Sequence, residues 1–254
     1  MNIYKKTKIH IFAYAALGRG ISGSDRIFIE LARQWGKKYF VNIYVTYEGL
    51  EMCKRQNLSS PYVSFCVSQL EFLRQFGFFV SYIIRIFNAI LKGFSIKIRN
   101  PRSEIIYSAS DFWMDSLPGL ILKLRYRKAI WVATWFQTAP NPIQGFAEGK
   151  RERRYRLSAF LYWMSQLPVK VTIKCFADYV LVNNADEKKQ FSELNKKNKV
   201  IVFIGAIDLE KIKRWIRTHG QFEKKYDAVF QGRFHPQKGV VELIEIWKKV
   251  VKIK

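Results

Sequence analysis

The sequence predicts an α/β protein built around a parallel, doubly wound β-sheet. Short apolar runs alternate with stretches whose apolar residues recur at helical spacing, which is typical of successive βαβ units. The first run, residues 8–14, leads through a glycine-rich turn into a helical stretch at 25–35 and a second run at 41–47. Hydrophobic residues make up 49% of the 254 residues, so the chain can bury a core in one large domain or two small ones.

The other expected elements follow in order along the chain. Further strands are expected at 62–67, 104–108 and 128–134, from about 177, at 199–204 and at 228–230. Further helices are expected at 70–94, near 110–118, at 157–174 with an interruption at Pro168, after Asn184, and at 240–251. His10 in the first strand is expected to be a core residue, and Asp111 and Asp115 are expected to cap a helix in preference to contacting a ligand.

The glycine-rich turn after the first strand allows two interpretations. Gly18, Gly20 and Gly23 satisfy Gly-x-Gly-x-x-Gly between a strand and a helix, and Glu48 follows the second strand. In a dinucleotide-binding fold these would hold a pyrophosphate and a ribose hydroxyl, so an NAD(P)-dependent oxidoreductase is one alternative. Ser22 or Ser24 is expected to cap the helix that follows, and the same turn also suits another class of phosphate-bearing ligand.

The charge of the chain points to a polyanionic partner. The formal net charge is +24 with a pI near 10.0, which fits phosphorylated substrates, an anionic membrane surface or nucleic acid. Nucleic acid is disfavoured because the sequence has no zinc-finger spacing or RNP-type aromatic motif. The three cysteines form no Cys-x-x-Cys pair, so we expect no metal site, reduced thiols and a cytoplasmic location.

Residues 70–94 form an aromatic-rich segment with one narrow polar stripe. Glu71, Arg74, Ser81, Arg85, Asn88 and Lys92 recur along it at helical spacing. A membrane-spanning helix is disfavoured because Arg85 and Asn88 would lie near the bilayer centre. The segment is either a buried helix packed on the sheet or an interfacial helix on the cytoplasmic membrane face. The basic run at 150–156 is either a solvated helix face or an anchor for anionic lipid.

Near the C-terminus, a strand, a glycine loop and a helix predict an anion site. Gly232 and Gly239 allow positive φ or close backbone approach, and the start of the next helix presents unpaired N–H groups. Arg233 and Lys238 add two cations, which suits a diphosphate.

This stretch, Gly-Arg-Phe-His-Pro-Gln-Lys-Gly at 232–239 followed by Val-x-Leu-Ile, resembles the donor domain of family-4 retaining glycosyltransferases, which have the GT-B fold. The resemblance implies that Arg233 and Lys238 hold the diphosphate of a nucleotide-sugar, the only co-substrate expected, with no cofactor. It implies that the loop of Gly18, Gly20 and Gly23 faces the acceptor and the donor phosphates. The acceptor pocket would include Trp135 and Gln137, where this family often has a histidine; no catalytic residue is assigned.

The resemblance also implies a domain organisation. Residues 1–208 would form a Rossmann-like acceptor-side domain, 209–225 a linker, and 226–254 the first βα unit of a Rossmann-like donor domain. The expected activity is sugar transfer to a lipid- or glycan-type acceptor with retention at the anomeric carbon. No Glu-x7-Glu motif of that family follows, so we expect a truncated donor domain, weak or no activity alone, and a separately encoded C-terminal half as partner. The third hypothesis is a non-catalytic basic module that binds membrane or nucleic acid.

Overall fold

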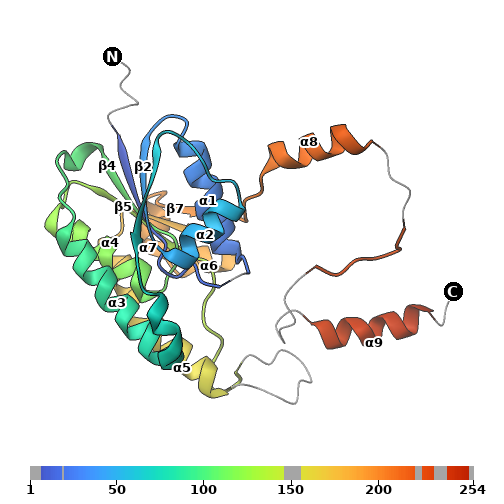
Figure 1. Cartoon of the computed structure of the whole chain (residues 1–254). Helices are drawn as coiled ribbons and strands as arrows, with labels where there is room; N and C mark the ends of the chain where they lie inside the picture. The colour runs from blue at the N-terminus through green and yellow to red at the C-terminus, as the bar shows by residue number, and fades with distance from the viewer. Residues whose placement is uncertain (1–6, 19, 146–155, 221–224, 232–238, 252–254) are drawn as a thin grey trace. The chain divides into compact units, whose positions relative to one another are not determined.

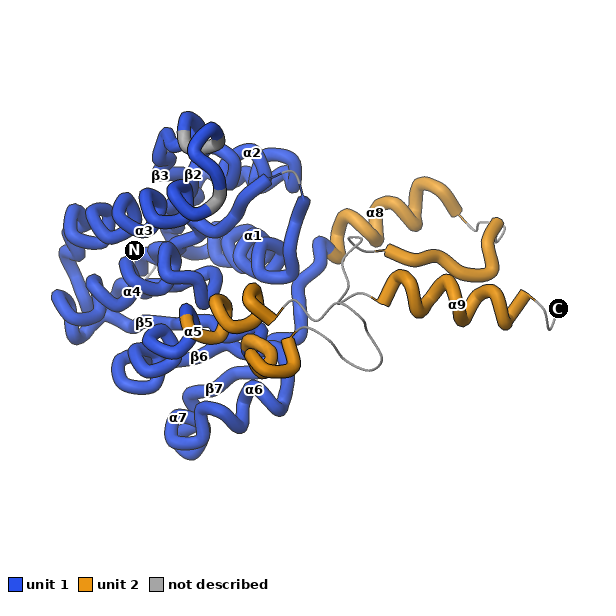
Figure 2. The backbone as a smooth tube through the Cα atoms, turned by 90° about the horizontal axis from the view of Figure 1, so that it is seen from below, with its two compact units in different colours: residues 1–138, 165–208 blue, residues 139–164, 209–254 orange. Residues whose placement is uncertain are grey.

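The computed structural model describes residues 7–18, 20–145, 156–220, 225–231 and 239–251. The chain divides into two compact units, residues 1–138 with 165–208, and residues 139–164 with 209–254 (Figure 2). The predicted domain borders at 208, 225 and 254 stay predictions. Residues 209–225, expected as a linker, contain helix α8, Leu209–His219.

The first unit contains a sheet of seven parallel strands, which confirms the predicted α/β class with a Rossmann-like, doubly wound sheet (Figure 1). The spatial order is β3-β2-β1-β4-β5-β6-β7, so the direction of winding reverses between β1 and β4. The strands are β1 Lys8–Phe12, β2 Phe40–Thr46, β3 Val63–Ser68, β4 Glu104–Ser108, β5 Ile130–Trp135, β6 Tyr179–Val182 and β7 Val200–Val202. Each lies within two residues of an expected run.

The helices of the first unit connect these strands. They are α1 Gly23–Trp35, α2 Tyr47–Arg55, α3 Gly77–Ser95, α4 Trp113–Arg125, the end of α5 Arg156–Phe176, α6 Ala185–Lys189 and α7 Ser192–Lys196, with short 3-10 turns η2 Glu71–Phe76 and η3 Pro101–Ser103. Ser22 caps α1 as predicted, within a capping box whose other member is Asp25, and Gly36 ends the helix. The predicted interruption of α5 is wrong, because the helix runs through Pro168.

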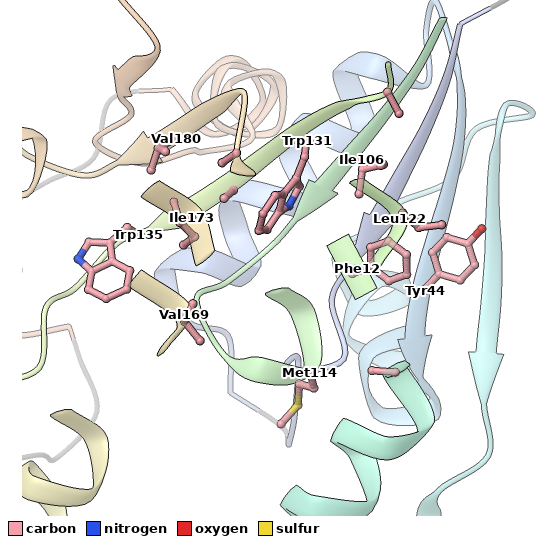
Figure 3. Packing of buried hydrophobic residues seen from close by; sticks show 14 of the residues in the cluster. Phe12, Tyr44, Ile106, Met114, Leu122, Trp131, Trp135, Val169, Ile173 and Val180 are labelled. Carbon is pink, nitrogen blue, oxygen red and sulfur yellow. The ribbon is translucent and has the colours of Figure 1, made fainter. Parts of the chain in front are cut away.

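Two hydrophobic cores lie on opposite faces of the sheet, because successive side chains of a strand alternate between faces. Ile9 and Ile11 of β1 pack with Phe28 of α1 in one core. Phe12 packs in the other, with Tyr44, Ile106 and Trp131 from neighbouring strands and side chains of α3, α4 and α5 (Figure 3). The α3–α5 side of the sheet therefore carries most of the aromatic packing.

His10 is a core residue, as predicted, and it is held by a buried carboxylate. Its Nε2 lies 2.8 Å from Glu104 Oε2 of β4, and its Nδ1 lies 2.9 Å from the Tyr44 hydroxyl of β2. Burial raises the pKa of Glu104, but hydrogen bonds from His10 and from the N–H groups of Asn100 and Arg99 outweigh it and lower that pKa. The group therefore ties β1 to both neighbouring strands, β2 and β4.

Two sequence expectations need correction. The helix expected over 70–94 is divided at Gly77, whose φ of +75° ends the 3-10 turn η2 and starts α3. The strand expected at 228–230 is absent, because residues 225–231 are irregular in the structure. A strand forms only where a neighbouring strand completes its hydrogen bonds, and the described residues of the second unit supply none.

The predicted helix at 240–251 is present as α9, Val240–Val251, and none of its residues is buried. The apolar side chains of α9 therefore have no covering layer among the described residues. Over the same described ranges, no helix is long and apolar enough to cross a bilayer.

Candidate functional site

A pocket of about 470 Å³ lies where the carboxyl ends of the strands meet helix α1. Its lining comes from the first turn of α1 at Gly23–Ile27, from Phe136 after β5, from Asn183 after β6 and from residues 204–207 after β7. All of these residues belong to the first unit. Ligands of doubly wound sheets bind at this edge, so the pocket is the candidate functional site.

The predicted glycine loop borders this pocket through Gly23. Gly18 adopts a φ of +74°, which favours glycine. A Cβ atom built on Gly20 or Gly23 would meet no described atom within 4 Å, so the space beside the start of α1 is open. Arg26, exposed in the first turn of α1, adds a cation to a helix end that already favours anions.

The dinucleotide alternative is not supported by the position of Glu48. Thr46 caps α2 directly after β2, so Glu48 lies in the first turn of that helix. Its carboxylate forms a largely buried ion pair with Arg85 of α3 at 3.3 Å. A carboxylate that recognises a ribose must present its oxygens to the ligand, and the third glycine of that motif should pack closely against a strand. Neither feature is found for Glu48 and Gly23 among the described residues.

The two residues predicted for an acceptor pocket lie in different environments. Trp135 is 1% exposed and belongs to the core (Figure 3). Its Nε1 donates to Thr138 Oγ1 at 2.9 Å and to Glu187 Oε2 at 3.1 Å. Gln137 is exposed, and its backbone carbonyl accepts a hydrogen bond from Gln166 Nε2 of α5 at 2.7 Å. Phe136, between them, is the residue of this segment that lines the pocket.

Two buried aspartates after β4 were expected as caps, and the structure gives them another role. The N-cap of α4 is Phe112, without a side-chain hydrogen bond to the helix. Asp115 instead accepts from the Ala15 N–H at 3.2 Å and from Ser110 Oγ at 2.6 Å, so it holds the segment after β1. Asp111 accepts from Gln166 Nε2 at 2.5 Å. Their position directly after a central strand is the signal that could have indicated this role.

Burial changes the protonation of both aspartates. Desolvation raises the pKa of Asp115 to about 8, against hydrogen bonds from Ser110 and from backbone N–H groups that favour the carboxylate. Desolvation likewise raises the pKa of Asp111 to about 6, against the hydrogen bond from Gln166. Asp115 is therefore largely a neutral acid at pH 7.

Asp115→Asn is expected to change how stability depends on pH. Because the folded pKa is raised, the contribution of Asp115 is complete below its unfolded pKa of about 4 and is lost as pH rises through about 8. Asparagine does not titrate. Between these pH values, the free energy of unfolding of the variant therefore rises relative to that of the wild type by about 1 kcal/mol per pH unit. Urea unfolding at several pH values from 5 to 8 measures this difference in the free energy of unfolding. Asp186 is fully exposed, so Asp186→Asn is the control, and its free energy of unfolding should depend on pH as that of the wild type does. Parallel profiles for wild type and Asp115→Asn would contradict the buried neutral acid.

The predicted diphosphate loop lies mostly outside the described residues. Gly232, Arg233 and Lys238 are not described, so their role stays a prediction. Gly239 is described and adopts a φ of +62°, as expected for a glycine at this place. Its carbonyl accepts from the Leu243 N–H at 2.8 Å, so α9 begins directly after the loop.

Over the described ranges, no group of three or more His, Cys, Asp or Glu side chains is placed to hold a metal ion. Cys53 is buried, Cys66 half-buried and Cys175 exposed, and none of the three forms a disulfide.

No protein-family model matches the chain, and no curated protein sequence matches it. Among solved structures, Anabaena Alr3699/HepE is similar in two crystal structures, one in complex with UDP and glucose and one with UDP-glucose. In both, the match has 12% identity and a TM-score of 0.44, and covers 84% of this chain and 50% of the other. S. aureus MnaA, in a co-structure with UDP, matches with 13% identity and a TM-score of 0.42, over 77% of this chain and 43% of the other. The chain thus spans half or less of the length of these structures, and a likeness at this level carries no argument about function.

Proposed function

We propose that this chain belongs to a nucleotide-sugar-dependent glycosyltransferase with a GT-B architecture. The observation that carries the proposal is the pocket at the carboxyl edge of the doubly wound sheet, with the open first turn of α1 and the cation of Arg26 on its wall. The sequence 232–239 adds a second phosphate-binding pattern, which ends at Gly239 and the start of α9. Two anion-binding elements on one chain suit a donor that carries a diphosphate.

In the proposed reaction, the leaving group is the nucleoside diphosphate. Arg233 and Lys238 would stabilise the negative charge that grows on its phosphate oxygens when the bond to the sugar breaks. The sugar would pass to a hydroxyl of a lipid- or glycan-type acceptor with retention at the anomeric carbon.

Nucleotide binding by the full chain tests the proposal. Isothermal titration with UDP and UDP-glucose, the ligands of the matched structures, is expected to show binding that Arg233→Ala weakens at least about tenfold, because a charge-assisted phosphate contact is lost. Lys238→Ala should act in the same direction. Lys248→Ala, which removes an exposed cation of α9 paired only with the helical neighbour Glu245 in the described contacts, is the matched control and should bind as the wild type.

Two results would count against this function. One is nucleotide binding that Arg233→Ala and Lys238→Ala leave unchanged. The other is a fluorescence increase of NADH on adding the protein that Glu48→Gln abolishes while circular dichroism shows the variant folded, since that would favour the oxidoreductase alternative. If a product forms with a supplied acceptor, NMR of its anomeric proton decides between retention and inversion.

A further inference from the structure

Helix α3 packs on the protein through a face that holds a buried arginine, and it exposes a row of large apolar side chains on the opposite face. Arg85, Ala89 and Gly93 follow one another at four-residue spacing, and all three are buried. A Cβ on Gly93 would lie 3.0 Å from Pro118 of α4, so this is the face on which α3 packs (Figure 1). The inward face of α3 therefore carries an arginine and small residues, with Tyr82 and Ile86 packed beside them against the core.

The inward polar groups of α3 contact residues of neighbouring elements. The Arg85 guanidinium is paired with Glu48 of α2, and Asn88 Oδ1 accepts from Ser68 Oγ of β3 at 2.8 Å. The ammonium of Lys92 lies 5.8 Å from the centre of the Tyr44 ring. These contacts fix the rotation of α3 about its axis, because turning its apolar side inward would carry Arg85 into solvent and leave the largely buried Glu48 carboxylate without its cation.

The outward face of α3 is a stripe of large apolar side chains, which we call the apolar stripe. Phe79 is 67% exposed, Phe87 63% and Leu91 66%. The members share four- or three-residue spacing along α3: Phe79, Ile83, Phe87, Leu91 and Phe94. Phe72 and Phe76 of η2, also exposed, extend it toward the N-terminus. A contiguous row of this size on a monomer marks an interaction surface.

The charge around the apolar stripe indicates which partner it fits. Three exposed basic residues, Lys97, Arg99 and Arg102, follow α3 directly, and residues 72–103 contain no acidic residue. Arg125 of α4 donates to the carbonyls of Gly93, Phe94 and Ile96, so a further cation lies at the C-terminal end of the stripe. Phenylalanine and leucine flanked by lysine and arginine suit the headgroup region of an anionic bilayer. A second copy fits less well, because it would bring together two chains that each carry a net charge of +24.

We infer that the apolar stripe of α3 is a docking surface for an anionic lipid membrane. The helix lies in the interface plane, with the stripe among the acyl chains near the headgroups and the basic residues at the lipid phosphates. The inference rests on the geometry of α3 and is independent of nucleotide binding.

Vesicle co-sedimentation of the full chain tests the inference. The wild type is expected to sediment with vesicles of phosphatidylcholine and phosphatidylglycerol, and much less with phosphatidylcholine alone. Phe79→Ser/Phe87→Ser/Leu91→Ser is expected to reduce binding to the anionic vesicles at least about tenfold, because three large apolar side chains no longer leave water. Tyr47→Ser, a similar change at a 46% exposed aromatic side chain of α2, is the matched control and should bind as the wild type.

Circular dichroism and thermal melting check that the triple variant folds, and if it does not, Phe79→Ser and Phe87→Ser carry the test singly. Anionic-vesicle binding that these variants leave unchanged would overturn the inference, because charge alone would then hold the protein on the membrane. A dimer that forms without vesicles in sedimentation velocity, and that the variants dissociate, would also overturn it in favour of a second copy.

Discussion

Glu48→Gln is expected to lower the free energy of unfolding by about 3 kcal/mol, although it only replaces one carboxylate oxygen by an amide NH2 group. The reason is that Arg85, 5% exposed, keeps its charge in the variant while its carboxylate partner at 3.3 Å becomes a neutral amide. Removing one partner of a buried pair leaves the desolvation cost of the other uncompensated. Urea unfolding at neutral pH, with the slope against denaturant unchanged, measures the loss.

Two controls separate this cause from a general effect of losing charge. Glu51→Gln removes the partner of Lys54 in an exposed pair on the same helix, and no measurable loss is expected. Glu48→Leu/Arg85→Met replaces both partners by apolar side chains and should recover most of the stability. If the double variant were as unstable as Glu48→Gln, the pair would not be the cause.

Glu187→Ala is the second change with a large expected effect, again about 3 kcal/mol. The Glu187 carboxylate, nearly buried in α6, accepts from the Thr138 N–H at 2.8 Å, Thr138 Oγ1 at 2.5 Å, Trp135 Nε1 at 3.1 Å and Gln190 Nε2 at 2.7 Å. Alanine leaves these donors without their shared acceptor. It also releases the segment after β5 that carries Phe136 to the pocket.

The neighbouring Asp186 supplies the control for Glu187. Its side chain is exposed and pairs with Lys189 on the same turn, so Asp186→Ala should unfold as the wild type does. Thermal unfolding compares the two variants directly, and tryptophan fluorescence of the native state should change in Glu187→Ala because Trp135 loses an acceptor. Equal stability of the two variants would mean that the segment after β5 is held by other contacts.

Much of the first unit could be predicted from local patterns. Ser22 with Asp25, followed by the stripe of Ile27 and Phe28 and ended by Gly36, specifies α1 without reference to the rest of the chain. The seven strands are short apolar runs that alternate with helices. A helix between two strands returns the chain to the starting end of the sheet, so the alternation indicates parallel strands. The glycine loop before α1 can likewise be recognised in the sequence, and its last glycine, Gly23, borders the pocket.

Other features depended on contacts between residues far apart in the sequence. Asp115 follows a turn and precedes a helix, which is typical of a cap, but its partner is the Ala15 N–H one hundred residues earlier. Trp135 lies at the carboxyl end of a strand, as a ligand-binding residue would, but Glu187 and the core enclose it. The run at 228–230 has the composition of a strand, and no described neighbour completes its hydrogen bonds.

Periodicity and composition within short windows are enough to predict the α/β class, the strands of the sheet and the charge. The same periodicity predicts a polar stripe on an otherwise apolar segment at 70–94. That the stripe faces inward depends on the folded chain, because the Glu48 carboxylate of α2 lies where it can neutralise Arg85. Burying a charge is tolerated only beside such a partner, and the position of that partner is a property of the folded chain.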